Sequence, residues 1–328
     1  MKRIALMAAL FAAFGGAAYA QSNVTIYGVV DANITFDDNG GPAGSAVRLD
    51  SGGQSGSRVG FRGTEDLGGG LSASFLLENG FNVDNGTLGQ GGLFFGRQAW
   101  VGLNGGFGSV KMGRQHNSIF NALLALDPFG VALAGDSSRL FTHYGYRMNN
   151  TLTYTTPNFG AVSAQLLYGF GETAGNNSAN RQLGLSATYA GGPLMLTLAH
   201  HKAENATGTD DANTTIAGGT YDFTVAKAHV AYAVNKGVGA LDTRDAMLGM
   251  TVPLGKTTLL ASYIRKDDKA VADADADQIA VGVSYELSKR TNFYSSLSRL
   301  SNDRLASYAA GAPGATAKLF NVGIRHRF

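Results

Sequence analysis

The amino-acid sequence predicts an all-β fold, a transmembrane antiparallel β-barrel of sixteen strands. Three observations predict it. Apolar and polar residues alternate along many short segments, tight turns and long polar loops follow one another between these segments, and the chain ends on an alternating segment that closes with Phe328. Alternation with a period of two is typical of strands, and short turns at one end with long loops at the other are typical of membrane barrels.

The first twenty residues are expected to be removed before the chain folds. The basic start Met1-Lys2-Arg3 precedes an apolar run from Ile4 to Phe14, and Ala18-Tyr19-Ala20 offers a cleavage site. This pattern predicts a secretory signal peptide over residues 1–20, because the apolar run is shorter than the roughly 20 residues that a membrane anchor needs. Residues 21–328 are expected to form one barrel domain.

The composition excludes several classes of function. Loss of Lys2 and Arg3 reduces the 26 basic residues to 24, equal to the 24 acidic ones, so no strong field for nucleic acid exists. The chain has no Cys, and its glycine clusters contain no phosphate-binding motif. The six His residues show no metal-ligand spacing. No metal or other cofactor is therefore expected, although the alternating acids in 273–277 leave open a bound Ca²⁺.

Each predicted strand rests on its own alternation. In Val24–Ile34, the side chains of Val24 and Ile26 share one face and those of Thr25 and Asp31 share the other. The stretch GSRVGFRG at 56–63 alternates arginine with apolar residues, which would place its apolar face toward lipid. Five further segments and the C-terminal segment 317–328 alternate in the same way: 71–81, 162–170, 182–189, 226–234 and 278–287.

The connections set the number of strands. Seven tight turns are expected at 66–70, 104–108, 157–160, 190–193, 222–224, 253–256 and 287–290. Eight long polar loops are expected near 36–56, 82–93, 116–148, 171–181, 202–214, 235–244, 267–277 and 301–316. Fifteen connections join sixteen strands, and a barrel of about sixteen strands encloses a water-filled channel. Alternation by itself also fits a secreted β-sandwich or an adhesin, but the terminal aromatic strand favours the barrel.

Several stretches resemble the general porins of Gram-negative outer membranes, in the neisserial-type branch found in β-proteobacteria. They include SRVGFRGTEDLGGGLSASFLLENGF at 57–81, GRQAWVGLNGGFGSVKMGRQ at 96–115 and GIRHRF at the end. The resemblance covers the whole mature chain. It implies a homotrimer in outer-membrane lipid that lets small hydrophilic solutes and ions diffuse through. It also implies that the third extracellular loop, 116–148, folds inward and forms a pore constriction.

The same resemblance implies which charges surround the constriction. By position, Arg58, Arg97 and Arg147 match the basic wall of such porins, and Asp136 and Asp127 match acids of the inward loop. These arginines come from alternate strands, which lie about 10 Å apart on one wall, so weak anion selectivity is expected. The alternative is a structural pairing of the arginines with wall carboxylates such as Asp31 or Glu78.

Three residues are expected as secondary pore-lining groups: Arg62, Lys111 and Tyr27. Arg62 lies four residues beyond Arg58 on the same strand face, toward the 66–70 turn, and is expected on the periplasmic side.

Arg97 conflicts with its neighbours in strand parity. It shares a face with Ala99, Val101 and Leu103, which would send it outward. Because arginine at the middle of a bilayer costs roughly 2–4 kcal/mol, we expect Arg97 to point inward. Gln98 and Trp100 would then face lipid or a neighbouring subunit.

Other functions compete with general diffusion. A substrate-specific outer-membrane channel is the main alternative, and a non-conducting structural barrel is a weaker one. An outer-membrane enzyme would need an activated serine, and no G-x-S-x-G motif occurs. The expected function is therefore a general diffusion channel and not an enzyme.

Overall fold

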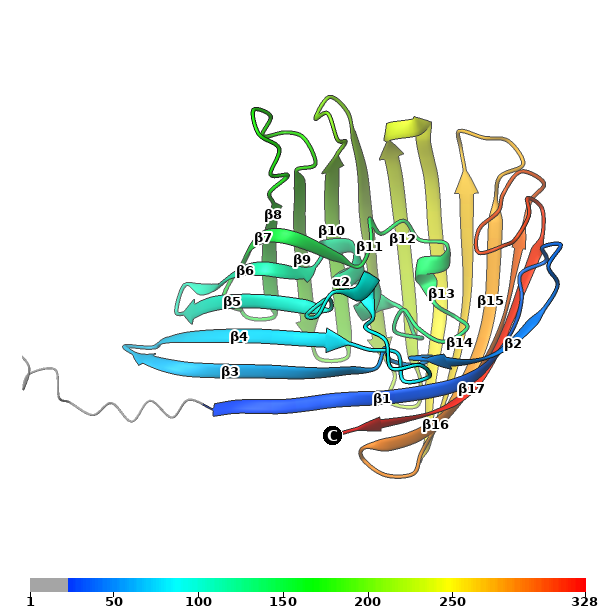
Figure 1. The fold of residues 1–328 in the computed structure, drawn as a ribbon, viewed down its shortest axis with the longest axis horizontal. Helices are drawn as coiled ribbons and strands as arrows, with labels where there is room; N and C mark the ends of the chain where they lie inside the picture. The colour runs from blue at the N-terminus through cyan, green and yellow to red at the C-terminus, as the bar shows by residue number, and fades with distance from the viewer. Residues whose placement is uncertain (1–22) are drawn as a thin grey trace, which may run out of the picture.

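The computed structural model describes residues 23–328. They form one antiparallel sheet whose two ends meet, because β1 (Asn23–Asp38) pairs with both β3 (Arg58–Gly68) and β17 (Thr316–Arg327). The short β2 (Ala46–Ser51) pairs with β1 inside the first long loop. The other 16 of the 17 strands therefore make a closed barrel wall, as the sequence predicts (Figure 1). The predicted signal peptide, residues 1–20, lies outside the described residues.

The remaining strands follow in chain order around the wall. They are β4 (Leu71–Gly80), β5 (Gln98–Gly105), β6 (Gly108–His116), β7 (Arg147–Thr155), β8 (Val162–Gly169), β9 (Gln182–Gly191), β10 (Leu194–Glu204), β11 (Asp211–Asp222), β12 (Lys227–Gly237), β13 (Leu241–Leu254), β14 (Thr257–Asp268), β15 (Ala276–Glu286) and β16 (Thr291–Asn302). Helical turns are short: α2 (Ser118–Leu126), η1 (Gln90–Gly92), η2 (Ser137–Arg139) and η3 (Val238–Ala240). Among the residues that the structure describes, no helix is both long and apolar enough to cross a membrane.

The two ends of the chain close the barrel. One edge of β1 pairs with β3 over residues 23–29 and with β2 over 32–37, and the other edge pairs with β17 over 29–38. Gly28 and Phe328 exchange two backbone hydrogen bonds of 3.1 Å. The Phe328 ring lies directly over Gly28, where a Cβ atom would come within 2.2 Å of it. The predicted terminal strand is thus confirmed, and Phe328, the residue that follows it, closes the junction with Gly28.

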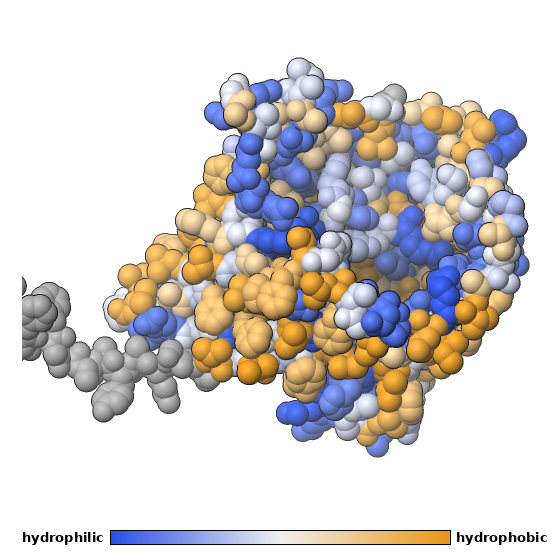
Figure 2. Space-filling model, viewed as in Figure 1, coloured by the Kyte–Doolittle hydropathy of each residue, from blue (hydrophilic) through white to orange (hydrophobic). Residues whose placement is uncertain are grey.

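Polar and apolar residues are distributed inside out relative to a water-soluble protein. Along β1, Val24 and Ile26 are 57% and 63% exposed, whereas Asp31 is fully buried. Figure 2 shows hydrophobic residues spread over the outer wall and mainly hydrophilic ones around the hollow that opens toward the viewer. A wall with an apolar outer face and a polar inner face suits a lipid surrounding and a wet interior.

The connections divide into two classes, as predicted. All seven expected tight turns join neighbouring strands. The expected long loop at 235–244 is wrong, because β12 runs to Gly237 and β13 begins at Leu241. The strands continue there because Asn235 on β12 bonds to Thr243 and Asp245 on β13. Polar residues on both faces of these strand ends therefore resemble a loop in the sequence.

Candidate functional site

The long connection between β6 and β7, residues 117–146, is called the third loop below. Its first residue, Asn117, is fully buried and caps α2, since its Oδ1 accepts a hydrogen bond from the Phe120 N–H at 2.7 Å. The Asn117 amide group also donates to the carbonyl oxygens of His143, at 2.6 Å, and Gly145. One side chain thus joins the beginning and the end of the third loop.

Asp127 organises the middle of the third loop. Its carboxylate accepts hydrogen bonds from the N–H groups of Phe129 at 2.8 Å, Val131 at 3.0 Å and Ser137 at 3.0 Å. Burial raises the pKa of Asp127 to about 6, against these hydrogen bonds. Asp127 is only 5% exposed, so the structure does not bring it to the cavity wall where the sequence analysis expected it. A carboxylate in a tight turn can accept hydrogen bonds from backbone N–H groups instead of contacting a solute, and Asp127 does so here.

Three glycines, on strands far in sequence from the third loop, leave space for its side chains. A Cβ atom at Gly218 would lie 2.8 Å from the Leu126 side chain. At Gly249 and Gly282 the corresponding neighbours are Pro128, at 2.7 Å, and Phe129, at 2.9 Å. The absence of side chains on β11, β13 and β15 therefore makes room for residues 126–129.

Hydrogen bonds fix the third loop to β12, β15 and β16. The Ala134 N–H donates to Ser296 Oγ at 2.9 Å, and His229 Nδ1 lies 2.9 Å from the Leu126 carbonyl oxygen. Arg139 Nη1 donates to Ser298 Oγ at 2.9 Å and to Gln278 Oε1 at 3.2 Å. The wall residues in these contacts belong to the face opposite the exposed apolar one.

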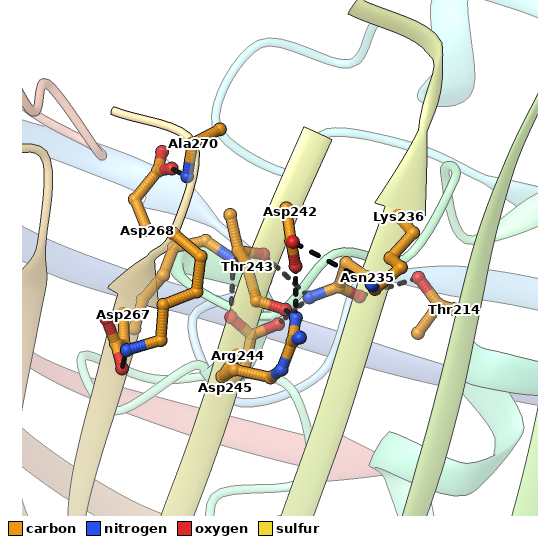
Figure 3. Close-up of polar contacts among 12 residues, drawn as sticks. Thr214, Asn235, Lys236, Asp242, Thr243, Arg244, Asp245, Asp267, Asp268 and Ala270 are labelled. Carbon is orange, nitrogen blue, oxygen red and sulfur yellow. Dashed lines mark hydrogen bonds and ion pairs between the residues drawn. The ribbon is translucent and has the colours of Figure 1, made fainter. Parts of the chain in front are cut away.

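A buried ion pair supports the last part of the third loop, and Figure 3 shows its acid, Asp245, beside Asn235. Asp245 and Lys266 have side chains 0% and 3% exposed, and Lys266 Nζ donates to the Asp245 carboxylate. The same carboxylate accepts from Asn235 Nδ2 at 2.7 Å and from the Thr142 N–H at 3.3 Å. The pair thus joins β13 and β14 to the third loop.

A cavity of about 560 Å³ lies between the third loop and strands β3 to β7. Its charged lining residues are Arg58, Arg97, Arg147, Glu78 and Asp136. Four of these five are residues that the sequence analysis assigned to a constriction. The fifth, Glu78, accepts from Arg97 Nε and lies 3.6 Å from Arg58 Nε. The charged lining therefore carries three guanidinium groups and two carboxylates. Arg58 and Arg97 line the cavity and also pair with the wall carboxylate Glu78, which was the alternative role considered for them.

Asp136 lies across the cavity on the third loop. Its carboxylate accepts a hydrogen bond from the Ser138 N–H at 2.8 Å and caps η2. Burial raises the pKa of Asp136, while the Arg139 guanidinium and these hydrogen bonds act in the opposite direction.

Arg97 lines the cavity, although strand parity would point its side chain outward. Residue 97 lies in a bend before β5, which begins at Gln98. Its carbonyl oxygen accepts a hydrogen bond from Arg147 Nε at 2.7 Å. The expectation that Gln98 and Trp100 face lipid or a neighbouring subunit is wrong, because both line a cavity together with Tyr27, Arg62 and Glu78. Alternation applies only within a strand, so Arg97 and Gln98 can point to the same side.

A second cavity, of about 620 Å³, adjoins the first. Glu78 and Gln98 line both. Tyr27 and Arg62 line the second one, with the Arg62 Cζ 5.2 Å from the centre of the Tyr27 ring. Lys111 Nζ lies 4.3 Å from the ring of Trp100, another of its lining residues. The three residues expected as secondary pore groups therefore lie together, next to the arginine-lined cavity.

One wall of the first cavity was not anticipated from the sequence. Backbone at Gly52–Gly56 lines it, held by the fully buried Asp31. The Asp31 carboxylate accepts from the N–H groups of Gln54 at 3.1 Å and Ser55 at 2.7 Å. The Gly53 carbonyl oxygen in turn accepts from the Leu133 N–H at 2.8 Å. The only sequence signal was a glycine-rich run next to a strand with an inward acid.

The described residues show no metal centre. Within 23–328, no group of three or more His, Asp or Glu side chains is placed to hold a metal ion. In the 273–277 run, the Asp275 carboxylate is bound by Arg265 Nη2 at 2.6 Å and by the Asp268 N–H at 2.8 Å.

Comparison with known proteins identifies the family of this chain. Residues 5–305 match the Gram-negative porin family. Outer membrane porin protein 32 of Delftia acidovorans is 35% identical over the full length of both chains, and an outer membrane porin protein of Bordetella pertussis is 31% identical, also over both full lengths. The structure of an anion-selective porin from Comamonas acidovorans superposes with a TM-score of 0.84 and 33% identity, covering 94% of this chain and 100% of that one. The closed barrel, the third loop fixed to its polar face and these relatives lead to one conclusion: the chain belongs to the Gram-negative porin family.

Proposed function

We propose that this outer-membrane protein is a general diffusion channel for small hydrophilic solutes with a weak preference for anions, acting as a channel and not as an enzyme. The observation that carries the proposal is the excess of guanidinium groups over carboxylates around one cavity, where Arg58, Arg97 and Arg147 face only Glu78 and Asp136. Guanidinium groups stay protonated at any working pH, and a fixed positive excess at a narrow point favours anions.

In this proposal the third loop lies inside the barrel and forms the narrow part of the channel. Its hydrogen bonds to Ser296 and Ser298 on β16 and its packing against glycines of β11, β13 and β15 support this position. Those strands are far in sequence from β6 and β7, which the third loop connects. The two adjoining cavities then form successive parts of one path.

The proposal includes export and assembly. The segment 1–20 acts as the signal peptide, and the mature chain forms homotrimers in outer-membrane lipid. The apolar outer wall, with residues such as Ile26 and Leu248 more than half exposed, supports burial of that surface in lipid or against other subunits. Mass measurement of the detergent-extracted protein by light scattering tests the trimer, and a monomer under mild extraction would contradict it.

The function itself is tested by electrophysiology. Refolded protein in planar bilayers should give discrete conductance steps, and a salt gradient should give a reversal potential of the sign expected for anion preference. Absence of any conductance in correctly folded protein would contradict the channel, while a clear cation preference would contradict only the role given to the arginines.

A further inference from the structure

The two sides of the arginine-lined cavity differ in chemistry. One side carries the guanidinium groups and the backbone of Gly52–Gly56. The other side belongs to the third loop and presents Phe120, Leu124, Val131 and Ala132. An anion in this cavity would therefore meet charge on one side and an apolar surface on the other.

The apolar side is not simply the edge of a packed core. On α2, Ile119, Leu123 and Leu126 are fully buried against the barrel wall, whereas Leu124 is 39% exposed and lines the cavity. Phe120 and Leu124 are four residues apart and so share one helix face. The Phe120 ring also contacts the Tyr146 ring, at 4.7 Å between centroids, and Tyr146 lines the same cavity. Phe120, Leu124 and Tyr146 are called the loop apolar face below, and Leu124 is its most exposed apolar side chain.

The opposite side has donors to spare. Glu78 is shared between Arg97 and Arg58, so one carboxylate faces two guanidinium groups. Arg147 donates from Nε to the Arg97 carbonyl oxygen, and its two Nη atoms have no hydrogen-bond partner among residues 23–328. A planar guanidinium with free donors suits a carboxylate, which it can bind in a bidentate manner.

We propose that this cavity is a weak binding site for aromatic monocarboxylates, with the carboxylate at Arg147 and Arg58 and the ring against the loop apolar face. The proposal rests on the channel function proposed above and adds a solute class to it. The volume of about 560 Å³ lies within the range of about 300–1,000 Å³ typical of small-molecule sites. Asp136, on the far side, opposes a second negative charge on the same solute, so monocarboxylates are favoured over dicarboxylates.

The test uses block of the chloride current through the intact protein in planar bilayers. Benzoate should reduce the current at a concentration several-fold lower than acetate or phthalate, whereas block set by size alone would make phthalate at least as potent as benzoate. In Leu124→Ser the advantage of benzoate over acetate should fall about five-fold, as expected for the loss of one or two buried methylene contacts. In Leu124→Met, which keeps an apolar side chain, the advantage should persist.

A matched control separates this effect from a general loss of apolar surface. Leu305, 48% exposed in the loop between β16 and β17, lies outside the cavity, so Leu305→Ser should behave like the unmodified protein. A channel that conducts chloride but shows benzoate no more potent than acetate, or an advantage unchanged in Leu124→Ser, would overturn the inference and leave the channel function intact. A protein that conducts no ions at all would instead overturn the proposed function.

Discussion

The buried ion pair between Asp245 and Lys266 offers the sharpest test of how the third loop is held. Replacement of Lys266 by Met keeps the length of the side chain and removes its charge. The Asp245 carboxylate, fully buried, would then have only the amide of Asn235 and the N–H of Thr142 as donors. Removal of one partner of a buried pair costs about 3–5 kcal/mol, because the other charge stays without compensation.

The measurement is equilibrium unfolding of the refolded protein in urea with lipid present, followed by the emission of Trp100, the one tryptophan of the chain. The double variant Asp245→Leu/Lys266→Met leaves no buried charge and should lose less free energy of unfolding than Lys266→Met by at least about 2 kcal/mol. Arg304→Met is the matched control, because the Arg304–Asp273 pair is largely exposed and should contribute at most about 1 kcal/mol. A cost for Lys266→Met no larger than that of the control would refute the reasoning.

Three further outcomes are expected. Asp136→Asn removes a cavity carboxylate, so the reversal potential in a salt gradient should move further toward anions; no movement would place Asp136 away from the ion path. Asp127 has a pKa raised to about 6, so the folded protein binds a proton more readily than the unfolded chain and its free energy of unfolding should fall as the pH rises from about 4 through about 6. Urea midpoints should show this fall in the unmodified protein, and an equal fall in Asp127→Asn would contradict it. Phe328→Ala removes the ring over Gly28, so folding into lipid vesicles, followed by the shift in electrophoretic mobility, should become less complete; folding equal to that of the unmodified chain would show that the ring does not seal the barrel.

Much of the fold could be predicted because the barrel depends on local patterns. Period-two alternation marks about half of the strands, and five of the seven tight turns contain glycine, so much of the wall could be predicted from short segments. The 235–244 segment was wrong as a loop, and the expected loop 36–56 contains β2. Strands that extend past the wall carry polar residues on both faces, and cross-strand bonds such as Asn235–Asp245 identify them as strands.

The site could be predicted only in part. Resemblance to porins drew attention to Arg58, Arg97, Arg147 and Asp136, and the structure places all four at one cavity. The inward direction of Trp100 was missed because alternation was carried through the bend at Arg97, where no strand exists.

Asp127 and Asp31 have roles that differ from those expected, and the physical reason is the same for both. Asp127 bonds to its own loop, while Asp31, expected at most as a wall partner of arginine, positions the backbone at Gln54 and Ser55. Which N–H groups surround a carboxylate depends on how distant segments meet, and alternation or spacing does not reveal that.

In our proposal the excess of arginine at the cavity sets the ion preference. The most direct test is the reversal potential of single channels in a KCl gradient, compared between the unmodified protein and the triple variant Arg58→Ala/Arg97→Ala/Arg147→Ala. We predict an anion-preferring channel whose reversal potential moves toward cations in the triple variant, because Glu78 and Asp136 are then the charges left at the cavity. A folded, conducting triple variant with an unchanged reversal potential would contradict the claim.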